Sequence, residues 1–283
     1  MDDYYFMNKK VVFLDIDGTF RDPVYGIPDS AVKAVENARK NGHIVIICTG
    51  RTMGLIPDDI DKNAFDGFIA GGGCHIEYCG KTIFDSEISS DKILKICNGL
   101  DRLGISYRIE TKKSVYMTPD MADKLGFLGC TADMNSELRQ MTAVNNKFQF
   151  RYTVDDYRKN PVSASKICTL SREKDFNDIL SIADGYYTIK HSDAKNSIVN
   201  TEIIQQGCDK GSAIKRMADY LKIDPNVCIS FGDSMNDVDM FAASGFSAAM
   251  ANGEKKLIEK ADMVCPHIME DGLYKGFKKI GLI

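Results

Sequence analysis

The fold is decided by a short apolar stretch that runs directly into two acidic residues. It reads Val11-Val12-Phe13-Leu14-Asp15-Ile16-Asp17-Gly18-Thr19. The apolar run is typical of a buried strand, and strand side chains alternate between faces, so we expect Asp15 and Asp17 on the same side. Two like charges so close together are costly without a cation or a shared proton. The pattern therefore indicates a divalent metal site that presents a nucleophilic carboxylate.

The alternative interpretation is a strand followed by an ordinary turn, because Asp-Gly is a common turn dipeptide. Gly18 lets the backbone turn sharply, and Thr19 can hydrogen-bond within that turn. A lone Asp-Gly pair is explained in this way. An apolar strand with two acids in register is not.

Composition limits the class of protein. The chain has 283 residues, 44% hydrophobic and 27% charged, which is ordinary for a globular protein with one large or two modest domains. A net charge of −4 gives no basic surface for nucleic acid, and no apolar run is long enough to span a membrane. The nine cysteines are scattered, without C-x-x-C spacing, so we expect no disulfide framework and a cytoplasmic location.

Strands and helices alternate in the first and last thirds of the chain. The apolar runs 44–48, 67–70, 226–231 and 246–250 are separated by helical patterns such as 30–40 and 210–221. Runs that are apolar on both faces, alternating with helices, are typical of a parallel α/β sheet. The last third therefore completes the sheet begun by the first.

The middle of the chain has a different pattern. Its strands alternate polar and apolar residues, as in a sheet with one wet face, and are expected at 105–110, 114–117, 147–152 and 166–170. Lys112-Lys113 is predicted to form a solvated turn that could alternatively reach a substrate. We therefore expect an α/β core over 1–82 and 192–283, split by an inserted α+β domain over 83–191.

Polar signatures follow the predicted strands, where ligands bind in open α/β sheets. Thr49-Gly50-Arg51 follows the second strand and offers a hydroxyl and a flexible backbone to a phosphoryl group. Lys210 lies just before a helix, where a cation opposes the helix dipole, so it is predicted to face a bound anion or clustered carboxylates. The alternative for Lys210 is a solvated surface lysine.

The second acidic cluster is Phe231-Gly232-Asp233-Ser234-Met235-Asn236-Asp237. A buried strand again stops at a glycine and presents carboxylates, the oxygen ligands that suit Mg²⁺. A capped helix start at Asp233 or Ser234 is the alternative. It explains one polar residue, not three.

These motifs, in this order, resemble the haloacid dehalogenase (HAD) superfamily across nearly the whole chain. The insert is similar to the C2 cap of the Cof-type (class IIB) sugar-phosphatase-like branch. The resemblance implies a Rossmann-like parallel-sheet core with a C2-type cap, and a phosphatase that acts on a small phosphorylated metabolite. It gives no oligomeric state.

The resemblance also implies residue roles. Asp15 would form an aspartyl-phosphate, and Asp17 would act as general acid and base. Mg²⁺ would be held by the Asp15 carboxylate, the main-chain carbonyl of Asp17 and Asp233, with Asp237 in support. The residues implied to contact phosphate or substrate are Thr49, Gly50, Arg51, Lys210 and Asn236.

One position departs from the family's pattern. Gly72 stands where relatives usually have Asn, so an amide contact is missing and substrate preference is expected to differ. Two other functions stay open: a phosphomannomutase-like phosphotransferase, and a catalytically silent binding protein. The silent protein is disfavoured because the nucleophile, the acid and the metal ligands are all present.

Overall fold

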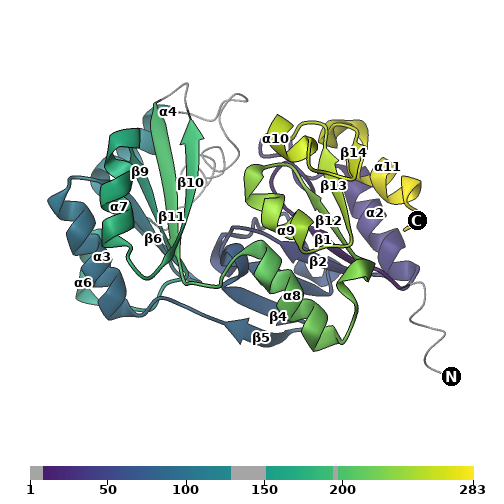
Figure 1. Ribbon diagram of the computed structural model, residues 1–283, viewed down its shortest axis with the longest axis horizontal. Coiled ribbons are helices and arrows are strands. Elements are labelled where there is room, and N and C mark those ends of the chain that lie inside the picture. The colour runs from purple at the N-terminus through teal and green to yellow at the C-terminus, as the bar shows by residue number, and fades with distance from the viewer. Residues whose placement is uncertain (1–8, 129–150, 194–196) are drawn as a thin grey trace. The chain divides into compact units, whose positions relative to one another are not determined.

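The computed structural model describes residues 9–128, 151–193 and 197–283. The chain divides into two compact units (Figure 1). The core unit contains the chain up to Gly50, Ile56–Asp85 and Asp209–Ile283, and the cap unit contains Arg51–Leu55 and Ser86–Cys208. No described helix is both long enough and apolar enough to cross a membrane.

The core unit is built on an eight-stranded sheet in the order β14-β13-β12-β1-β2-β3-β4-β5. Its strands are β1 (Val11–Leu14), β2 (Ile44–Cys48), β3 (Gly67–Ala70), β4 (His75–Tyr78), β5 (Lys81–Asp85), β12 (Cys228–Gly232), β13 (Phe246–Met250) and β14 (Met263–Cys265). Neighbours from β14 to β3 are parallel, and β4 and β5 are antiparallel. The predicted α/β fold is confirmed.

Helices cover both faces of this sheet (Figure 1). They are α2 (Asp29–Lys40), α8 (Lys210–Leu221), α9 (Val238–Ala242), α10 (Lys255–Ile258) and α11 (Gly272–Lys279). Ile214 and Met217 of α8 pack with Phe13 and Ile46 on one face. Helices α2 and α11 pack together. Strands β1 and β2 are consequently buried along their whole length, as their continuous apolar sequences predict.

The cap unit has a six-stranded sheet in the order β10-β11-β9-β6-β7-β8. Its strands are β6 (Ser106–Glu110), β7 (Val115–Met117), β8 (Arg151–Thr153), β9 (Lys166–Ser171), β10 (Tyr187–Asp193) and β11 (Ile198–Ile204). The helices are α3 (Ser90–Arg102), α4 (Pro119–Leu128), α6 (Val154–Lys159) and α7 (Phe176–Ile182). Part of the expected strand 147–152 lies outside the described residues.

One face of the cap sheet is apolar and packs on helices. Tyr107, Ile109 and Ile167 contact apolar side chains of α3, α6 and α7 in one cluster. The opposite face carries a second cluster, in which Leu55 packs with residues of α4, β7 and β9. Every second residue of β6, β9 and β11 therefore faces away from α3, α6 and α7.

The expected insert, 83–191, differs from this division at three places. The cap unit begins at Ser86 and not at 83, because β5 belongs to the core sheet. Its C-terminal boundary lies after Cys208, because β10 pairs with β11 and β11 pairs with β9. A domain boundary at residue 191 would fall inside β10. The segment Arg51–Leu55 also joins the cap unit, because Leu55 is buried in the cap's apolar cluster.

Candidate active site

The candidate site lies where three parallel strands end. Strand β1 pairs with both β2 and β12, so their carboxyl ends meet at one edge of the sheet. Asp15 follows β1, Thr49 follows β2, and Asp233 follows β12. The sheet thus brings together residues that lie far apart in the sequence.

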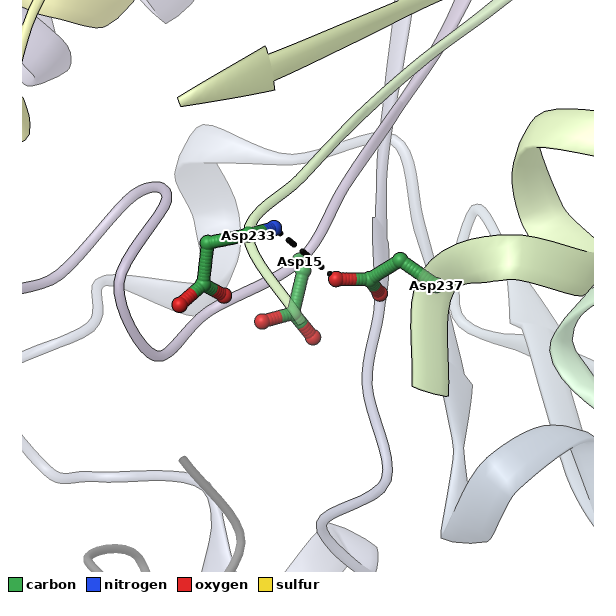
Figure 2. Close-up of side chains that lie close together, drawn as sticks. All are labelled: Asp15, Asp233 and Asp237. Atoms are coloured by element: carbon green, nitrogen blue, oxygen red, sulfur yellow. Dashed lines mark hydrogen bonds between the residues drawn. The ribbon is translucent and has the colours of Figure 1, made fainter. Parts of the chain in front are cut away.

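Three buried carboxylates gather at this edge. Asp15, Asp233 and Asp237 each place an oxygen within 4.8 Å of the others, and Figure 2 shows the three side chains side by side. Gly18 makes room for the group: its φ is +87°, and a Cβ there would overlap the Asp233 carboxylate. A cluster of this kind needs a cation or protons to be stable.

Lys210 supplies one positive charge to the cluster. Its side chain is 3% exposed, and its Nζ lies 2.7 Å from Oδ1 of Asp15 and 2.6 Å from Oδ1 of Asp237. It also lies 3.3 Å from Oδ1 of Asn236. Lys210 is the first residue of α8, which is capped by the side chain of Asp209. It is therefore placed against clustered carboxylates and is no solvated surface lysine.

Asp237 also holds the loop after β12. Its Oδ2 accepts hydrogen bonds from the backbone N–H groups of Asp233 (3.0 Å) and Ser234 (3.1 Å). Gly232 is required here, because a Cβ at this position would overlap the Asp237 side chain. The other oxygen of Asp237, Oδ1, accepts a hydrogen bond from Nζ of Lys210. Because both oxygens are engaged, Asp237 is suited to positioning Asp233 rather than to binding a ligand directly.

The charges of the cluster do not balance. Three carboxylates against one ammonium leave two negative charges uncompensated. Burial raises the pKa of Asp15 to about 8, Lys210 opposes this shift, and Asp237 and Asp17 reinforce it. The same carboxylates hold the pKa of Lys210 well above its ordinary value, against the effect of burial. The donor set, two carboxylate ligands with a deficit of positive charge, fits a hard divalent cation such as Mg²⁺.

Asp17 does not reach its place by strand alternation. Strand β1 ends at Leu14, and the Ile16 carbonyl accepts hydrogen bonds from the N–H groups of Phe20 and Arg21. Asp17 therefore lies in a turn, and the argument from a period of two was wrong. Its carboxylate is buried and lies outside the group of three acids, although it is close enough to raise the pKa of Asp15.

The remaining predicted residues fall into different units. Thr49 is buried in the core unit, and its carbonyl accepts the N–H of Gly72 at 3.1 Å. Gly50 is the last residue of the first segment of the core unit. Arg51 belongs to the cap unit, where its Nη1 donates to the Leu55 carbonyl at 3.0 Å.

The glycine run after β3 lets two segments approach each other closely. Gly71, Gly72 and Gly73 all have positive φ. A Cβ at Gly73 would overlap the carbonyl of Asp209, the residue before Lys210. The position of Gly72, which departs from the family's pattern, is thus part of a turn that lies against the start of α8.

Asn252 is a residue of the site that the sequence analysis missed. Its Nδ2 donates to the Gly18 carbonyl at 2.7 Å, and its Oδ1 accepts the N–H of Ile268 at 2.9 Å. It fixes the turn after Asp15 from the neighbouring loop. Asn252-Gly253 follows β13 after one residue, Ala251, so a polar residue just past the end of a fourth parallel strand was the signal that could have found it.

Comparison with known proteins places the chain in a family. Residues 12–277 match the family of haloacid dehalogenase-like hydrolases. YkrA of Bacillus subtilis (strain 168) is 25% identical over 98% of this chain and 100% of its own length. The HMP-PP phosphatase of Enterobacter sp. (strain 638) is 24% identical over 88% of this chain and 86% of its own length.

Solved structures share the fold. BT1666 from Bacteroides thetaiotaomicron, a HAD phosphatase, has a TM-score of 0.79 at 21% identity, covering 97% of this chain and 96% of that one. The subclass IIB sugar phosphatase BT4131 has a TM-score of 0.76 at 20% identity, covering 97% of this chain and all of that one. The chain therefore belongs to the haloacid dehalogenase-like hydrolases, in the Cof-type branch that its motifs predict.

Proposed function

We propose that the chain is a Mg²⁺-dependent phosphatase that hydrolyses a small phosphorylated metabolite through an aspartyl-phosphate intermediate. The observation that supports this most is the placement of Asp15, which lies beside Asp233 and Asp237 and accepts a hydrogen bond from Lys210. Relatives named as phosphatases of HMP-PP and of 5-amino-6-(5-phospho-D-ribitylamino)uracil support a small phosphorylated substrate.

The proposed metal ligands are the carboxylates of Asp15 and Asp233 and the main-chain carbonyl of Asp17, with Asp237 in support. When bound, Mg²⁺ allows an anionic carboxylate to approach an anionic phosphate and neutralises charge during the transfer. The uncompensated charge of the buried acids supports this assignment.

In the first step, a carboxylate oxygen of Asp15 attacks phosphorus and the bond from phosphorus to the alcohol oxygen breaks. Asp17 donates a proton to the leaving oxygen. In the second step, Asp17 accepts a proton from water as the water oxygen attacks phosphorus, and the bond to Asp15 breaks. Inorganic phosphate leaves, and both carboxyl groups return to their starting protonation states.

The phosphoryl oxygens would be bound by Thr49, by the backbone of Gly50 and by the Lys210 ammonium. Lys210 is already held by two carboxylates, so its Nζ is oriented before the phosphate arrives. Arg51 and Asn236 are proposed to contact phosphate or substrate. We place the enzyme in the cytoplasm, on the pattern of its cysteines alone.

The test is hydrolysis of p-nitrophenyl phosphate with Mg²⁺ by the wild type, Asp15→Asn and Asp29→Asn. Asp29 is an exposed acid in the first turn of α2 and serves as the matched control. We expect Asp15→Asn to lose roughly 10⁴-fold or more in kcat, as when a nucleophile is removed. Unchanged turnover by Asp15→Asn would refute the nucleophile.

Product analysis separates hydrolysis from the phosphotransferase alternative. A phosphatase releases inorganic phosphate in proportion to the ester consumed. A mutase converts one phosphorylated isomer into another with little phosphate released. A chain that releases no phosphate from any ester while it binds phosphorylated metabolites would be the silent binding protein.

A further inference from the structure

The turn that carries Asp17 is closed by the backbone of Arg21. The N–H of Arg21 donates to the Ile16 carbonyl at 2.8 Å, and the Arg21 carbonyl accepts the N–H of Gly18 at 2.8 Å. Asp17 and Arg21 are accordingly paired as an isolated β-bridge. The residues on both sides of Asp17 are thus bonded to Arg21, so a movement of Arg21 moves Asp17.

The side chain of Arg21 is buried and pairs with an acid from another segment of the core unit. It is 6% exposed, and its Nε donates to Oδ1 and Oδ2 of Asp59 at 3.0 and 2.9 Å. Asp59 lies between the buried residues Ile56 and Ile60, and both segments belong to the core unit. The ion pair therefore connects the turn to a loop that is fixed in the core by apolar side chains.

The hairpin that continues from Arg21 encloses the same ion pair. Asp22 and Gly26 exchange backbone hydrogen bonds of 2.9 and 3.0 Å. Nη1 of Arg21 donates to the Asp22 carbonyl at 3.4 Å, and a Cβ at Gly26 would lie 4.0 Å from Oδ2 of Asp59. The guanidinium is thus engaged within the protein, which suits it to holding the turn rather than to binding a ligand.

The exposure of Asp59 indicates what the ion pair does. The Asp59 side chain is 45% exposed, so water screens the pair and its contribution to global stability is small. Position has a larger effect on catalysis, because a displacement of about 1 Å can lower a rate roughly 100-fold. The pair is therefore better suited to fixing the turn than to stabilising the fold.

We propose that Arg21 is a positioning residue, whose ion pair with Asp59 fixes the turn so that Asp17 can protonate the leaving oxygen. The inference rests on the proposed function, which assigns the acid–base step to Asp17. Neither Arg21 nor Asp59 contacts the substrate in this scheme. Both act through the backbone of the turn.

The test is the leaving-group dependence of kcat/KM in Asp59→Ala, assayed at saturating Mg²⁺. The p-nitrophenolate ion is a weak base and leaves without a proton, whereas the alkoxide from n-propyl phosphate needs a proton from Asp17. Because kcat/KM reports the step in which Asp15 displaces the leaving group, the loss for n-propyl phosphate should exceed the loss for p-nitrophenyl phosphate by about tenfold or more. Equal losses for the two esters, or no loss, overturn the proposal.

Two further variants separate positioning from a general structural effect. Asp58→Ala is the matched control, because Asp58 is the neighbouring exposed acid of the same loop. It should keep the wild-type kcat/KM for both esters. Asp59→Glu retains the carboxylate and should recover most of the loss for n-propyl phosphate. Failure of Asp59→Glu to recover any of it would contradict a role for the ion pair.

Amide hydrogen exchange in the full-length protein gives a readout that needs no substrate. The N–H groups of Gly18 and Arg21 should exchange faster in Asp59→Ala than in the wild type, whereas that of Val12 in β1 should not change. If the wild type hydrolyses neither ester, the proposed function has failed. In that case, or if the wild type cleaves only p-nitrophenyl phosphate, exchange decides. Faster exchange confined to the turn supports the positioning role of Arg21, and unchanged exchange overturns it.

Discussion

The two buried ionic clusters of this chain differ in how their charges balance. The core cluster has three carboxylates around one lysine, whereas the cap cluster has two cations and two anions. The cap cluster lies on β6, β9 and β11 and comprises the buried side chains of Arg108, Glu110, Lys166 and Glu202. Burial raises the pKa of Asp15 to about 8, despite Lys210. Burial also acts to raise the pKa of Glu202, but Lys166, His191 and Arg108 together outweigh it, and the pKa falls below 4.5. The core cluster is thus suited to binding a further cation. The charged side chains of the cap cluster already compensate one another.

The largest effect on stability that we expect is the loss in Lys166→Met. The substitution removes the ammonium that pairs with both Glu110 and Glu202 and leaves these carboxylates buried. Removing one partner of a buried ion pair costs about 3–5 kcal/mol. Urea denaturation of this variant beside Lys174→Met, a cap lysine outside the cluster, measures the difference. A loss below about 1 kcal/mol would contradict a tightly balanced cluster.

Lys210→Met tests the core cluster with the same substitution. Its main effect should be on catalysis, because Lys210 is proposed to bind the transferring phosphoryl group. Loss of one such electrostatic contact lowers kcat by about 10²–10³-fold. The matched control is Lys215→Met, an exposed lysine on the same helix. If kcat falls equally in both variants, the assignment of Lys210 is wrong.

The sequence predicted the core cluster well because its acids directly follow buried strands. Asp15 and Asp233 each end an apolar run, and parallel pairing of β1 with β12 then requires them to be neighbours. The place of Arg51 could not be predicted in this way. It depends on Leu55, whose apolar partners on β7 and β9 come from distant parts of the sequence.

The cap cluster was not predicted at all. Arg108, Lys166 and Glu202 appear in the sequence as ordinary polar positions of alternating strands, which suggest a wet face. Only the register of β6, β9 and β11 brings them together and buries them. The late boundary at Cys208 has the same cause, because β10 belongs to the cap sheet through its pairing with β11.

Asn252→Leu tests the residue that the sequence analysis missed. It removes the hydrogen bonds to the Gly18 carbonyl and from the Ile268 N–H. Unsatisfied backbone groups of this kind cost about 1–3 kcal/mol. We expect a stability loss in that range and a lower kcat, because the turn that carries Asp17 loses its anchor. Normal kcat in a destabilised protein would limit Asn252 to a structural role.

The smallest expected effect is a change in the pH dependence of stability in Glu202→Gln. In the wild type the folded-state pKa of Glu202 lies below its ordinary value of 4.5, because Lys166, His191 and Arg108 together outweigh the effect of burial. The unfolded state therefore binds more protons in the window below about pH 4.5, and stability falls there as the pH falls. One such group changes the free energy of unfolding by at most about 1.4 kcal/mol per pH unit.

Glu202→Gln should flatten the stability curve in that window, measured by urea denaturation between pH 3 and pH 6. Glu173→Gln is the control, because Glu173 is an exposed cap glutamate that pairs with Lys190. Its curve should stay parallel to that of the wild type. A Glu202→Gln curve that also runs parallel would mean that the surrounding cationic groups do not hold the pKa of Glu202 below its ordinary value. The contrast between a balanced cap cluster and an acidic core cluster would then lose its basis.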